Sequence, residues 1–305
     1  MPRCRVALAG LLALLAVAGC AGPEPERRRI RIATGSPTAV YYAVGTALAG
    51  VIEQAMPGTD ASVLATAASA ENVQLISHGD AEIGFTQADV LVAQGGPVVA
   101  LARVYDDLLH LVVRKDSPVR TLEDLRGKRV SVGARGSGTV VTVGRLLTVA
   151  RMSGAGVVDQ RQLSLDDSVR ALSAGQIDAF FFSGGLPVAG IERLSATAPT
   201  RIVDLSKWAG ELRKSYSDVY VVRDVPTSAY HVPAVATVAV PNLLVVAASM
   251  PDDLAYDLAK LLMERRDVLA AAHPAAERLD VRSAIATLPV PLHPGAARYY
   301  RSVKP

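Results

Sequence analysis

Two short loops rich in glycine and serine carry the residues best suited to binding chemistry. Gly35-Ser36 follows the strand-like segment RIRIAT (29–34), and Gly136-Ser137-Gly138-Thr139 follows KRVSVG (128–133) after two residues. Each loop precedes a helical stretch, so unpaired backbone N–H groups and the positive end of the helix dipole face whatever lies before the helix. A single loop of this kind is more often a tight turn capped by Ser or Thr. Because the arrangement occurs twice, we expect the two loops to converge on an anionic group in a cleft.

The motifs of common enzyme classes are absent from the sequence. Residues 133–139, GARGSGT, have the glycine spacing of a phosphate-binding loop, but Thr139 stands where a lysine must reach the phosphates. Neither Ser137 nor Ser183 lies in a G-x-S-x-G nucleophile elbow, and the five histidines form no H-E-x-x-H zinc motif. We therefore expect a binding protein without catalytic residues, cofactor or bound metal.

The first twenty residues have the pattern of an export signal. A short basic start is followed by residues 6–18, which are all Ala, Val, Leu or Gly, a run too short to span a bilayer but typical of a signal peptide. The next residues, VAGC (17–20), resemble the lipobox of bacterial lipoproteins, which implies cleavage after residue 19 and acylation of Cys20. We expect a signal peptide at 1–19, a tether at 20–29 and anchoring to the outer face of the cytoplasmic membrane. An ordinary cleaved signal peptide is the alternative.

Composition and charge exclude several classes of protein. The chain has 305 residues, of which 50% are hydrophobic and 20% charged, so it holds ample core for a folded α/β protein. The formal net charge is +3, and it falls to +1 once Arg3 and Arg5 leave with the signal peptide. No clustered basic surface for nucleic acid is expected, since the arginines at 27–31 read as a solvated tether. Cys20 is the only cysteine left after cleavage, so no internal disulfide can form.

Short apolar segments alternate with amphipathic stretches from residue 29 onward, which is typical of an α/β fold. We expect strands at 29–34, 61–66, 81–87, 108–114, 128–133 and 235–249, and helices at 41–55, 71–77, 139–152 and 251–272.

A quasi-repeat indicates two similar lobes. LISHGDAEIGF (75–85) matches ALSAGQIDAFF (171–181) at a constant offset of 96 residues. The matched pairs are Gly79 with Gly175, Glu82 with Asp178, and Phe85 with Phe181. The apolar segment 235–249 could run antiparallel to 108–114 as a two-strand hinge. We therefore expect one lobe from 30–113 and 236–305 and a second lobe from 114–235.

Six motifs resemble the TRAP-associated extracytoplasmic immunogenic (TAXI) family of solute receptors. They are ATGSPTAVYYAVGTALA (33–49), TAASAEN (66–72), GDAEIGFTQADV (79–90), LEDLRGKRVSVGARGSGT (122–139), GQIDAFFFSGGLP (175–187) and VATVAVPNLLVV (235–246). The resemblance runs from about residue 30 to about residue 273. It implies a type II periplasmic-binding-protein fold with two α/β lobes joined by a two-strand hinge. It also implies a receptor that delivers a small organic acid or amino acid, with glutamate-like ligands known in the family, to a TRAP membrane permease.

The same resemblance implies the ligand contacts. Carried over onto this sequence they are Gly35, Ser36, Thr38, Tyr41, Ser69, Asn72, Gln87, Ser137, Gly138, Thr139, Ser183 and Gly184. Four places depart from the family pattern, with alanine at 39, at 43 and at 67–68, and arginine at 135. The additional methyl groups would narrow the pocket, and Arg135 would add a charge near it.

Three functions are compatible with this sequence. The first is a membrane-tethered receptor for a small anion or zwitterion, such as L-glutamate, glutamine or a dicarboxylate. The second is a secreted α/β enzyme that shares the two-lobe fold. The third is a signalling input domain, which the lack of an output segment before Pro305 disfavours. The receptor explains the duplicated loops and the missing catalytic motifs best.

Overall fold

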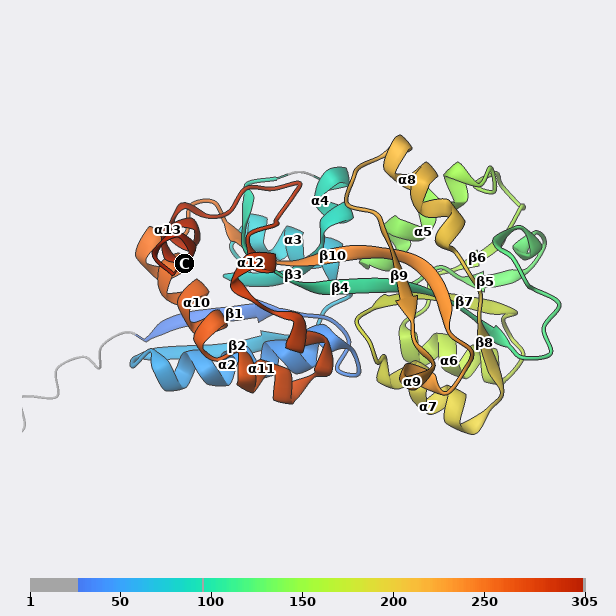
Figure 1. Cartoon of the computed structure of the whole chain (residues 1–305), viewed down its shortest axis with the longest axis horizontal. Helices are drawn as coiled ribbons and strands as arrows, with labels where there is room; N and C mark the ends of the chain where they lie inside the picture. The colour runs from blue at the N-terminus through green and yellow to red at the C-terminus, as the bar shows by residue number, and fades with distance from the viewer. Residues whose placement is uncertain (1–26, 95, 304–305) are drawn as a thin grey trace, which may run out of the picture.

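The computed structural model describes residues 27–94 and 96–303, and within them a ten-stranded sheet runs through two lobes (Figure 1). The predicted signal peptide (1–19), Cys20 and most of the tether lie outside the described residues. The strands are β1 (Arg28–Ala33), β2 (Thr59–Leu64), β3 (Ile83–Gln87), β4 (Val98–Arg114), β5 (Arg129–Ser131), β6 (Asp159–Arg161), β7 (Ala179–Gly184), β8 (Thr200–Ile202), β9 (Val221–Val225) and β10 (Val235–Ala247).

Helices cover this sheet in both lobes (Figure 1). The α-helices are α2 (Val40–Ala55), α3 (Ser69–His78), α4 (Ala88–Gln94), α5 (Gly138–Val149), α6 (Leu165–Ser173), α7 (Ala189–Thr197), α8 (Ala209–Ser215), α9 (Thr227–Tyr230), α10 (Asp252–Glu264), α11 (Arg266–Ala272), α12 (Val281–Ala284) and α13 (Pro294–Ser302). Short 3-10 helices occur at Leu122–Leu125, Ser206–Trp208 and Pro274–Arg278. No helix among the described residues combines the length and the hydropathy needed to cross a bilayer.

The order of the strands is symmetric about the centre of the sheet. It runs β2-β1-β3-β10-β4-β7-β5-β6, with β8 paired to β4 and β9 to β10. β1 is parallel to β2 and β3, and β5 is parallel to β6 and β7. β3 and β7 each pair antiparallel with one of the two central strands, β10 and β4. We call the part built on β1 to β3 the first lobe and the part built on β5 to β7 the second lobe.

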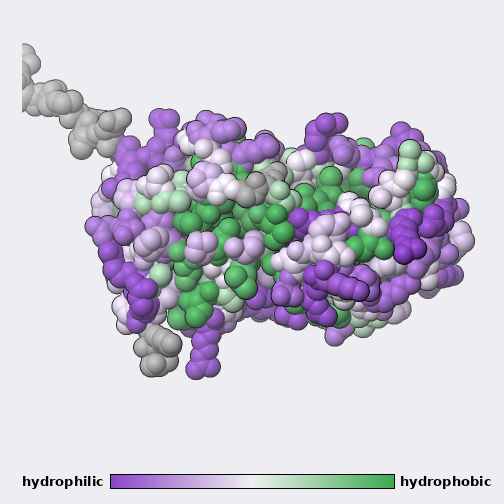
Figure 2. All heavy atoms as spheres, turned by 90° about the horizontal axis from the view of Figure 1, so that it is seen from above, coloured by the Kyte–Doolittle hydropathy of each residue, from purple (hydrophilic) through white to green (hydrophobic). Residues whose placement is uncertain are grey.

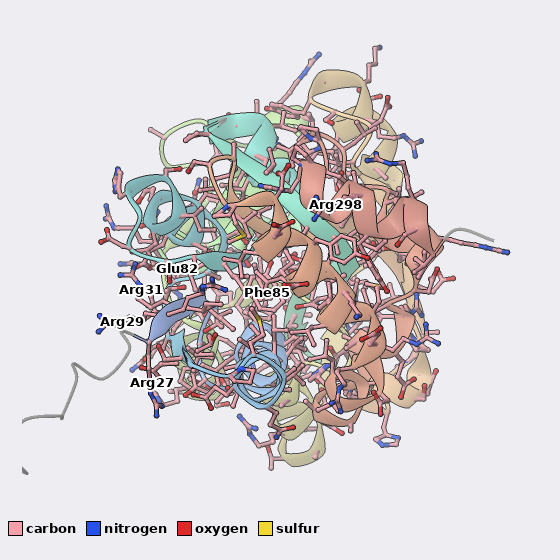
Figure 3. All side chains as sticks on the ribbon, turned by 90° about the vertical axis from the view of Figure 1, so that its left-hand side faces the viewer. Arg27, Arg29, Arg31, Glu82, Phe85 and Arg298 are labelled. Atoms are coloured by element: carbon pink, nitrogen blue, oxygen red, sulfur yellow. The ribbon has the colours of Figure 1, made fainter. Side chains whose placement is uncertain are left out.

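The quasi-repeat in the sequence is a repeat in the structure. Arg31 and Glu82 form an ion pair at 2.7 Å, and Arg129 and Asp178 form the corresponding pair at 2.8 Å. Each carboxylate also accepts the backbone N–H of its arginine. Figure 3 shows the first of these pairs at one end of the molecule. Each pair ties the first strand of its lobe to the turn before the third strand, so the equivalence of the two lobes is confirmed.

The two central strands connect the lobes. Residues 239–247 of β10 pair antiparallel with β4, which then pairs with β7 from Leu108 to Val113. β10 therefore runs antiparallel to β4 as predicted, but the register differs from the prediction. β4 begins ten residues earlier, at Val98, and β10 pairs with residues 98–108, so that it meets the predicted segment 108–114 only at Leu108. The register of the pair is irregular next to Pro241, which has no N–H to donate to the ladder.

The single helix predicted at 251–272 is wrong, since the chain forms two helices there. Arg265 separates α10 from α11 with φ −112° and ψ 21°, which is not helical. The break lets α10 pack on α13 while α11 packs on α2. The contact of α10 with α13 is close, because a Cβ at Gly295 would lie 2.8 Å from the carbonyl carbon of Asp252.

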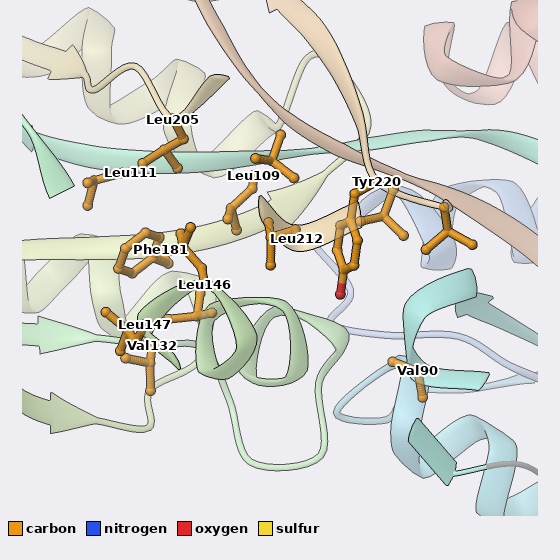
Figure 4. Packing of buried hydrophobic residues seen from close by; sticks show 14 of the residues in the cluster. Val90, Leu109, Leu111, Val132, Leu146, Leu147, Phe181, Leu205, Leu212 and Tyr220 are labelled. Carbon is orange, nitrogen blue, oxygen red and sulfur yellow. The ribbon is translucent and has the colours of Figure 1, made fainter. Parts of the chain in front are cut away.

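Buried side chains form clusters in each lobe and between them. Ile30, Ile32 and Phe85 belong to the first lobe's cluster, with α2 and α10 packed over it. Leu109 and Phe181 belong to a cluster that extends across the central strands, and Figure 4 shows both residues beside Leu146 of α5. On the face seen in Figure 2, hydrophilic side chains cover both ends of the molecule and hydrophobic ones gather over its middle. Because buried residues of the strands belong to these clusters, the hydrophobic core holds the ends of the strands in place in both lobes.

Candidate functional site

A cavity of about 290 Å³ lies between the two lobes. Ten of the twelve residues expected to contact ligand line it, namely Gly35, Ser36, Tyr41, Ser69, Gln87, Ser137, Gly138, Thr139, Ser183 and Gly184. They come from both lobes and lie at strand ends or helix starts, where the sequence places them. The structure therefore brings the two Gly-Ser loops to one cavity, 100 residues apart in the chain.

The starts of four helices converge on this cavity. The capping residue and the first residue of each helix line it, namely Ala39 and Val40 of α2, Ala68 and Ser69 of α3, Ser137 and Gly138 of α5, and Ser164 and Leu165 of α6. In the second lobe the Ser137 and Ser164 side chains accept backbone N–H groups of their own helices. In the first lobe both caps are alanines, which offer no such acceptor. Four positive dipole ends make this wall of the cavity attractive to an anion.

Gln87 joins the two lobes at the base of the cavity. Its Nε2 donates to Oδ2 of Asp107 at 2.9 Å and also to the hydroxyl of Ser183. Its backbone N–H donates to the hydroxyl of Ser69, and the N–H of Ser183 donates to Thr139 in the same way. Gln87 and Ser183 are 96 residues apart, which is the offset of the quasi-repeat. The corresponding ends of β3 and β7 therefore face each other across the cavity.

Three buried polar groups on the wall lack a hydrogen-bond partner among the described residues. They are Oε1 of Gln87, the hydroxyl of Tyr105 and Oδ1 of Asp107, in side chains that are 1%, 3% and 4% exposed. Burial raises the pKa of Asp107 to about 7, against the amide groups of Asn242 and Gln87, which lower it. Buried polar groups are nearly always satisfied in folded proteins, so these three mark the place where a bound solute or water completes the network.

Two predicted contact residues lie away from the cavity wall. Asn72 is fully buried, and its amide nitrogen donates to the carbonyl oxygens of Thr34 at 2.6 Å and Phe85 at 2.8 Å. It therefore holds β1 to β3. Thr38 turns outward, and its hydroxyl donates to Asp166 of the second lobe at 3.1 Å. It connects the lobes at the rim of the cavity.

Tyr41 lines the cavity with its ring, while its hydroxyl points to the central strands. The ring stacks on Phe85 with centroids 5.1 Å apart. The hydroxyl donates to Oδ1 of Asn242 on β10 and lies 3.3 Å from the hydroxyl of Ser69. Tyr41 therefore supplies shape to the wall, and its polar atom belongs to a buried network.

The departures from the TAXI pattern have different structural consequences. The methyl groups at Ala39, Ala67 and Ala68 line the cavity, whereas Ala43 and Arg135 do not. Arg135 is exposed and does not line the cavity, although its neighbour Ala134 does. Ala68 has φ 88° and ψ −140°, a conformation that glycine adopts far more readily, at a cost of about 1–3 kcal/mol.

Several lining residues were missed in the sequence, although signals for them exist. Tyr105 and Asp107 lie on β4, where the pair Asp106-Asp107 stands in a largely apolar strand. Ser164 and Leu165 stand 96 residues after Ala68 and Ser69, so the repeat could have found them. An acidic residue inside a buried strand and the second copy of a predicted helix start were the two useful signals.

The fold and the cavity define a two-lobed architecture, and comparisons with known proteins agree. The family model of the NMT1-like family matches residues 32–303, and the chain belongs to this family. The periplasmic aliphatic sulphonate binding protein SsuA of Escherichia coli is similar with a TM-score of 0.53 and 15% identity, over 91% of this chain and 84% of that one.

Two further solved structures have the same fold. A putative L-cystine ABC transporter protein from Listeria monocytogenes matches with a TM-score of 0.56 and 12% identity, over 80% of this chain and 94% of that one. A Streptococcus mutans structure concerned with glutathione import via GshT matches with a TM-score of 0.55 and 16% identity, over 82% and 95%. Identities this low show the fold alone. The predicted type II periplasmic-binding-protein fold is confirmed.

Proposed function

We propose that the protein is an extracytoplasmic solute receptor that captures a small carboxylate in the cavity between its lobes. The observation that carries this proposal is the convergence of four helix starts and three unpartnered, buried polar groups on one cavity built from both lobes. The helix starts favour an anionic group on the solute. The two-lobed fold supplies a hinge at the central strands, about which such proteins close on their solutes.

In this proposal the two lobes divide at β4 and β10, the paired strands that pass from one lobe to the other. Residues 30–113 and 236–305 then form the first lobe and residues 114–235 the second. Contacts between them surround the cavity. Thr38 donates to Asp166 on one side, and the N–H groups of Ala70 and Glu71 donate to the carbonyl oxygen of Gly136 at 3.0 and 3.3 Å on another.

Delivery to a TRAP-type membrane permease is the finer part of the proposal. The solved structures of similar fold include proteins of ABC importers, so the fold does not select the type of transporter. The TRAP assignment therefore rests on the six motifs that resemble the TAXI family. A glutamate-like amino acid or a dicarboxylate fits this role. A secreted enzyme is disfavoured, since none of the described residues that line the cavity is a histidine, lysine or cysteine that could activate its serines.

A thermal-shift panel on refolded, solute-free protein tests the receptor. Ligand at about 100 times its dissociation constant adds about 2.7 kcal/mol to the free energy of unfolding, so a small carboxylate should raise Tm by about 5–10 °C. Gln87→Ala should reduce the shift, because it removes the donor shared by Asp107 and Ser183. Gln160→Ala, at an exposed position of β6, is the matched control and should leave the shift unchanged. If sugars, polyamines or metal ions shift Tm and no carboxylate does, the proposal fails.

The proposed lipid anchor is tested at Cys20. Cys20→Ser should move the protein from the membrane to the soluble exported fraction, because the acyl chains on this residue are the proposed anchor. Cys4→Ser, within the predicted signal peptide, is the control and should leave the protein on the membrane. Mass spectrometry of the wild-type chain should find a lipid on Cys20, and a mature N-terminus at another, unmodified residue would contradict the anchor.

A further inference from the structure

We propose that Asp107 makes the cavity selective for a solute with an ammonium group beside its carboxylate, namely an amino acid with an uncharged, apolar side chain. This inference rests on the proposed receptor function and narrows its class of solute, because it excludes dicarboxylates. Three features of the cavity carry it, and each concerns a different part of the solute.

The first feature is the excess of hydrogen-bond acceptors at the base of the cavity. Oδ1 of Asp107 and Oε1 of Gln87 are both acceptors, both buried, and both without a partner among the described residues. The other oxygen of Asp107 accepts the Nε2 of Gln87, and the nearby amide nitrogen of Asn242 has no partner within hydrogen-bond distance either. An ammonium group brings three donors and a positive charge to this point, whereas a carboxylate would bring further acceptors and a like charge.

The second feature is that the anion-binding wall contains dipoles and no cation. Among the described residues that line the cavity there is no lysine, arginine or histidine, and Arg135 lies outside it. The four helices that start at the wall have between 9 and 16 residues, so their dipole ends can hold a carboxylate without a cation. A second carboxylate beside Asp107 would meet a like charge with no cationic side chain in the wall to offset it, which is unfavourable in a buried site.

The third feature is the apolar surface that remains for the side chain of the solute. It consists of Ala39, Val40, Ala67, Ala68, Leu165 and Phe182, with the three alanine methyl groups projecting where the family pattern predicts less bulk. A cavity of about 290 Å³ with this surface suits a branched or linear aliphatic side chain. The solute therefore has an anionic end, a cationic end and an apolar body.

Calorimetric titration of refolded protein with matched probes tests this selectivity. The probes are L-leucine, the same skeleton with a keto group in place of the ammonium group (4-methyl-2-oxopentanoate), and succinate. Wild-type protein should bind L-leucine at least about 100-fold more tightly than the other two. Asp107→Asn should weaken the binding of L-leucine by about 100-fold, because removing the charge of one partner in a buried charge pair is costly. The affinity for the oxo acid should stay unchanged or increase.

Asp106→Asn is the matched control, since this carboxylate lies next in the strand and pairs with Arg103 and Arg223 instead of facing the cavity. It should leave the ratio of the L-leucine and oxo-acid affinities within about threefold of wild type. Equal or tighter binding of the oxo acid or succinate to wild type, or an equal loss for both monocarboxylates in Asp107→Asn, overturns the selectivity and leaves the receptor intact. Binding of none of these probes, with no carboxylate active in the thermal-shift panel, overturns both.

Discussion

Gly138→Ala should weaken solute binding by about 100-fold and leave the fold of each lobe intact. Gly138 begins α5 in the second lobe and faces the first lobe directly. A Cβ at this position would lie 2.7 Å from Cδ of Gln87 and 2.8 Å from the hydroxyl of Ser69. Gln87 cannot move aside without losing its bonds to Asp107 and Ser183. Overpacking and the lost hydrogen bonds together cost the closed form about 3 kcal/mol, which is about 100-fold in affinity.

A second glycine in the same helix provides the control. A Cβ at Gly144 would meet no atom within 4 Å, so Gly144→Ala should keep solute affinity and raise stability slightly, as glycine-to-alanine changes in helices do. Titration calorimetry measures both variants, and small-angle scattering at saturating solute measures closure. Wild-type affinity in Gly138→Ala would show that the lobes do not meet at this point when solute is bound.

Asp107→Asn should make the solute-free protein more stable than wild type at pH 8 by about 2–4 kcal/mol. Burial raises the pKa of Asp107 from 3.8 to about 7, so the folded state binds this proton more tightly than the unfolded state does. The stability that this proton provides is fully present below about pH 4 and is lost as the pH rises through about 7. A shift of about three pKa units corresponds to about 4 kcal/mol, and asparagine removes this dependence on pH.

Comparing Asp107→Asn with wild type isolates the contribution of the Asp107 carboxyl group to the pH dependence of stability. Nearby acids at Asp106 and Asp89 also raise the pKa of Asp107, and they are retained in both proteins. Chemical denaturation of solute-free protein between pH 4 and pH 8 should give equal stabilities at the acid end and a growing advantage for Asp107→Asn above about pH 6. A constant difference across this range would show that Asp107 does not change its protonation on unfolding. The predicted growth of the advantage would show that the ionised carboxylate lowers the stability of the solute-free protein, a cost that the ammonium group of a solute offsets.

The contacts around the cavity describe a closed arrangement of the lobes. Asp89, at the start of α4, is fully buried and accepts the hydroxyl of Thr142 at 2.6 Å and that of Tyr220 at 3.0 Å, both from the second lobe. Arg145 donates to the carbonyl oxygen of Asp89 and to the same tyrosine. Together with Gln87 and Ser183, which line the cavity, these groups hold the lobes together. Polar contacts suit a surface that must separate, because water can replace them on opening.

Local patterns in the sequence were enough to predict two α/β lobes and the position of the site, while the resemblance to a known family supplied the particular fold. The repeat at an offset of 96 residues predicted two equivalent lobes, and the Gly-Ser loops predicted the helix starts that meet at the cavity. These features depend on neighbours in the chain and on the rule that strands end at a shared edge. The break at Arg265 was not visible, because both halves of that segment carry a helical pattern and tertiary packing on α2 and α13 decides where they part.

The composition of the cavity could not be read from the sequence. Asp107 lies just before the strand expected at 108–114, and only the longer β4, paired with β10, places it beside Gln87. Asn72 and Thr38 belong to the same motifs as true wall residues, yet one faces β1 and the other the rim. The direction of a side chain within a loop depends on long-range contacts. A motif carried over from a family therefore predicts the position of a site more reliably than it predicts which of its residues contact the ligand.

A crystal structure of protein purified without unfolding, then saturated with the strongest solute of the thermal-shift panel, tests the receptor function most directly. The account predicts density for one small molecule in the cavity, with its carboxylate at the helix starts that line the cavity and its ammonium group against Asp107. Density for the solute at another place, or only water in the cavity at saturation, would contradict it.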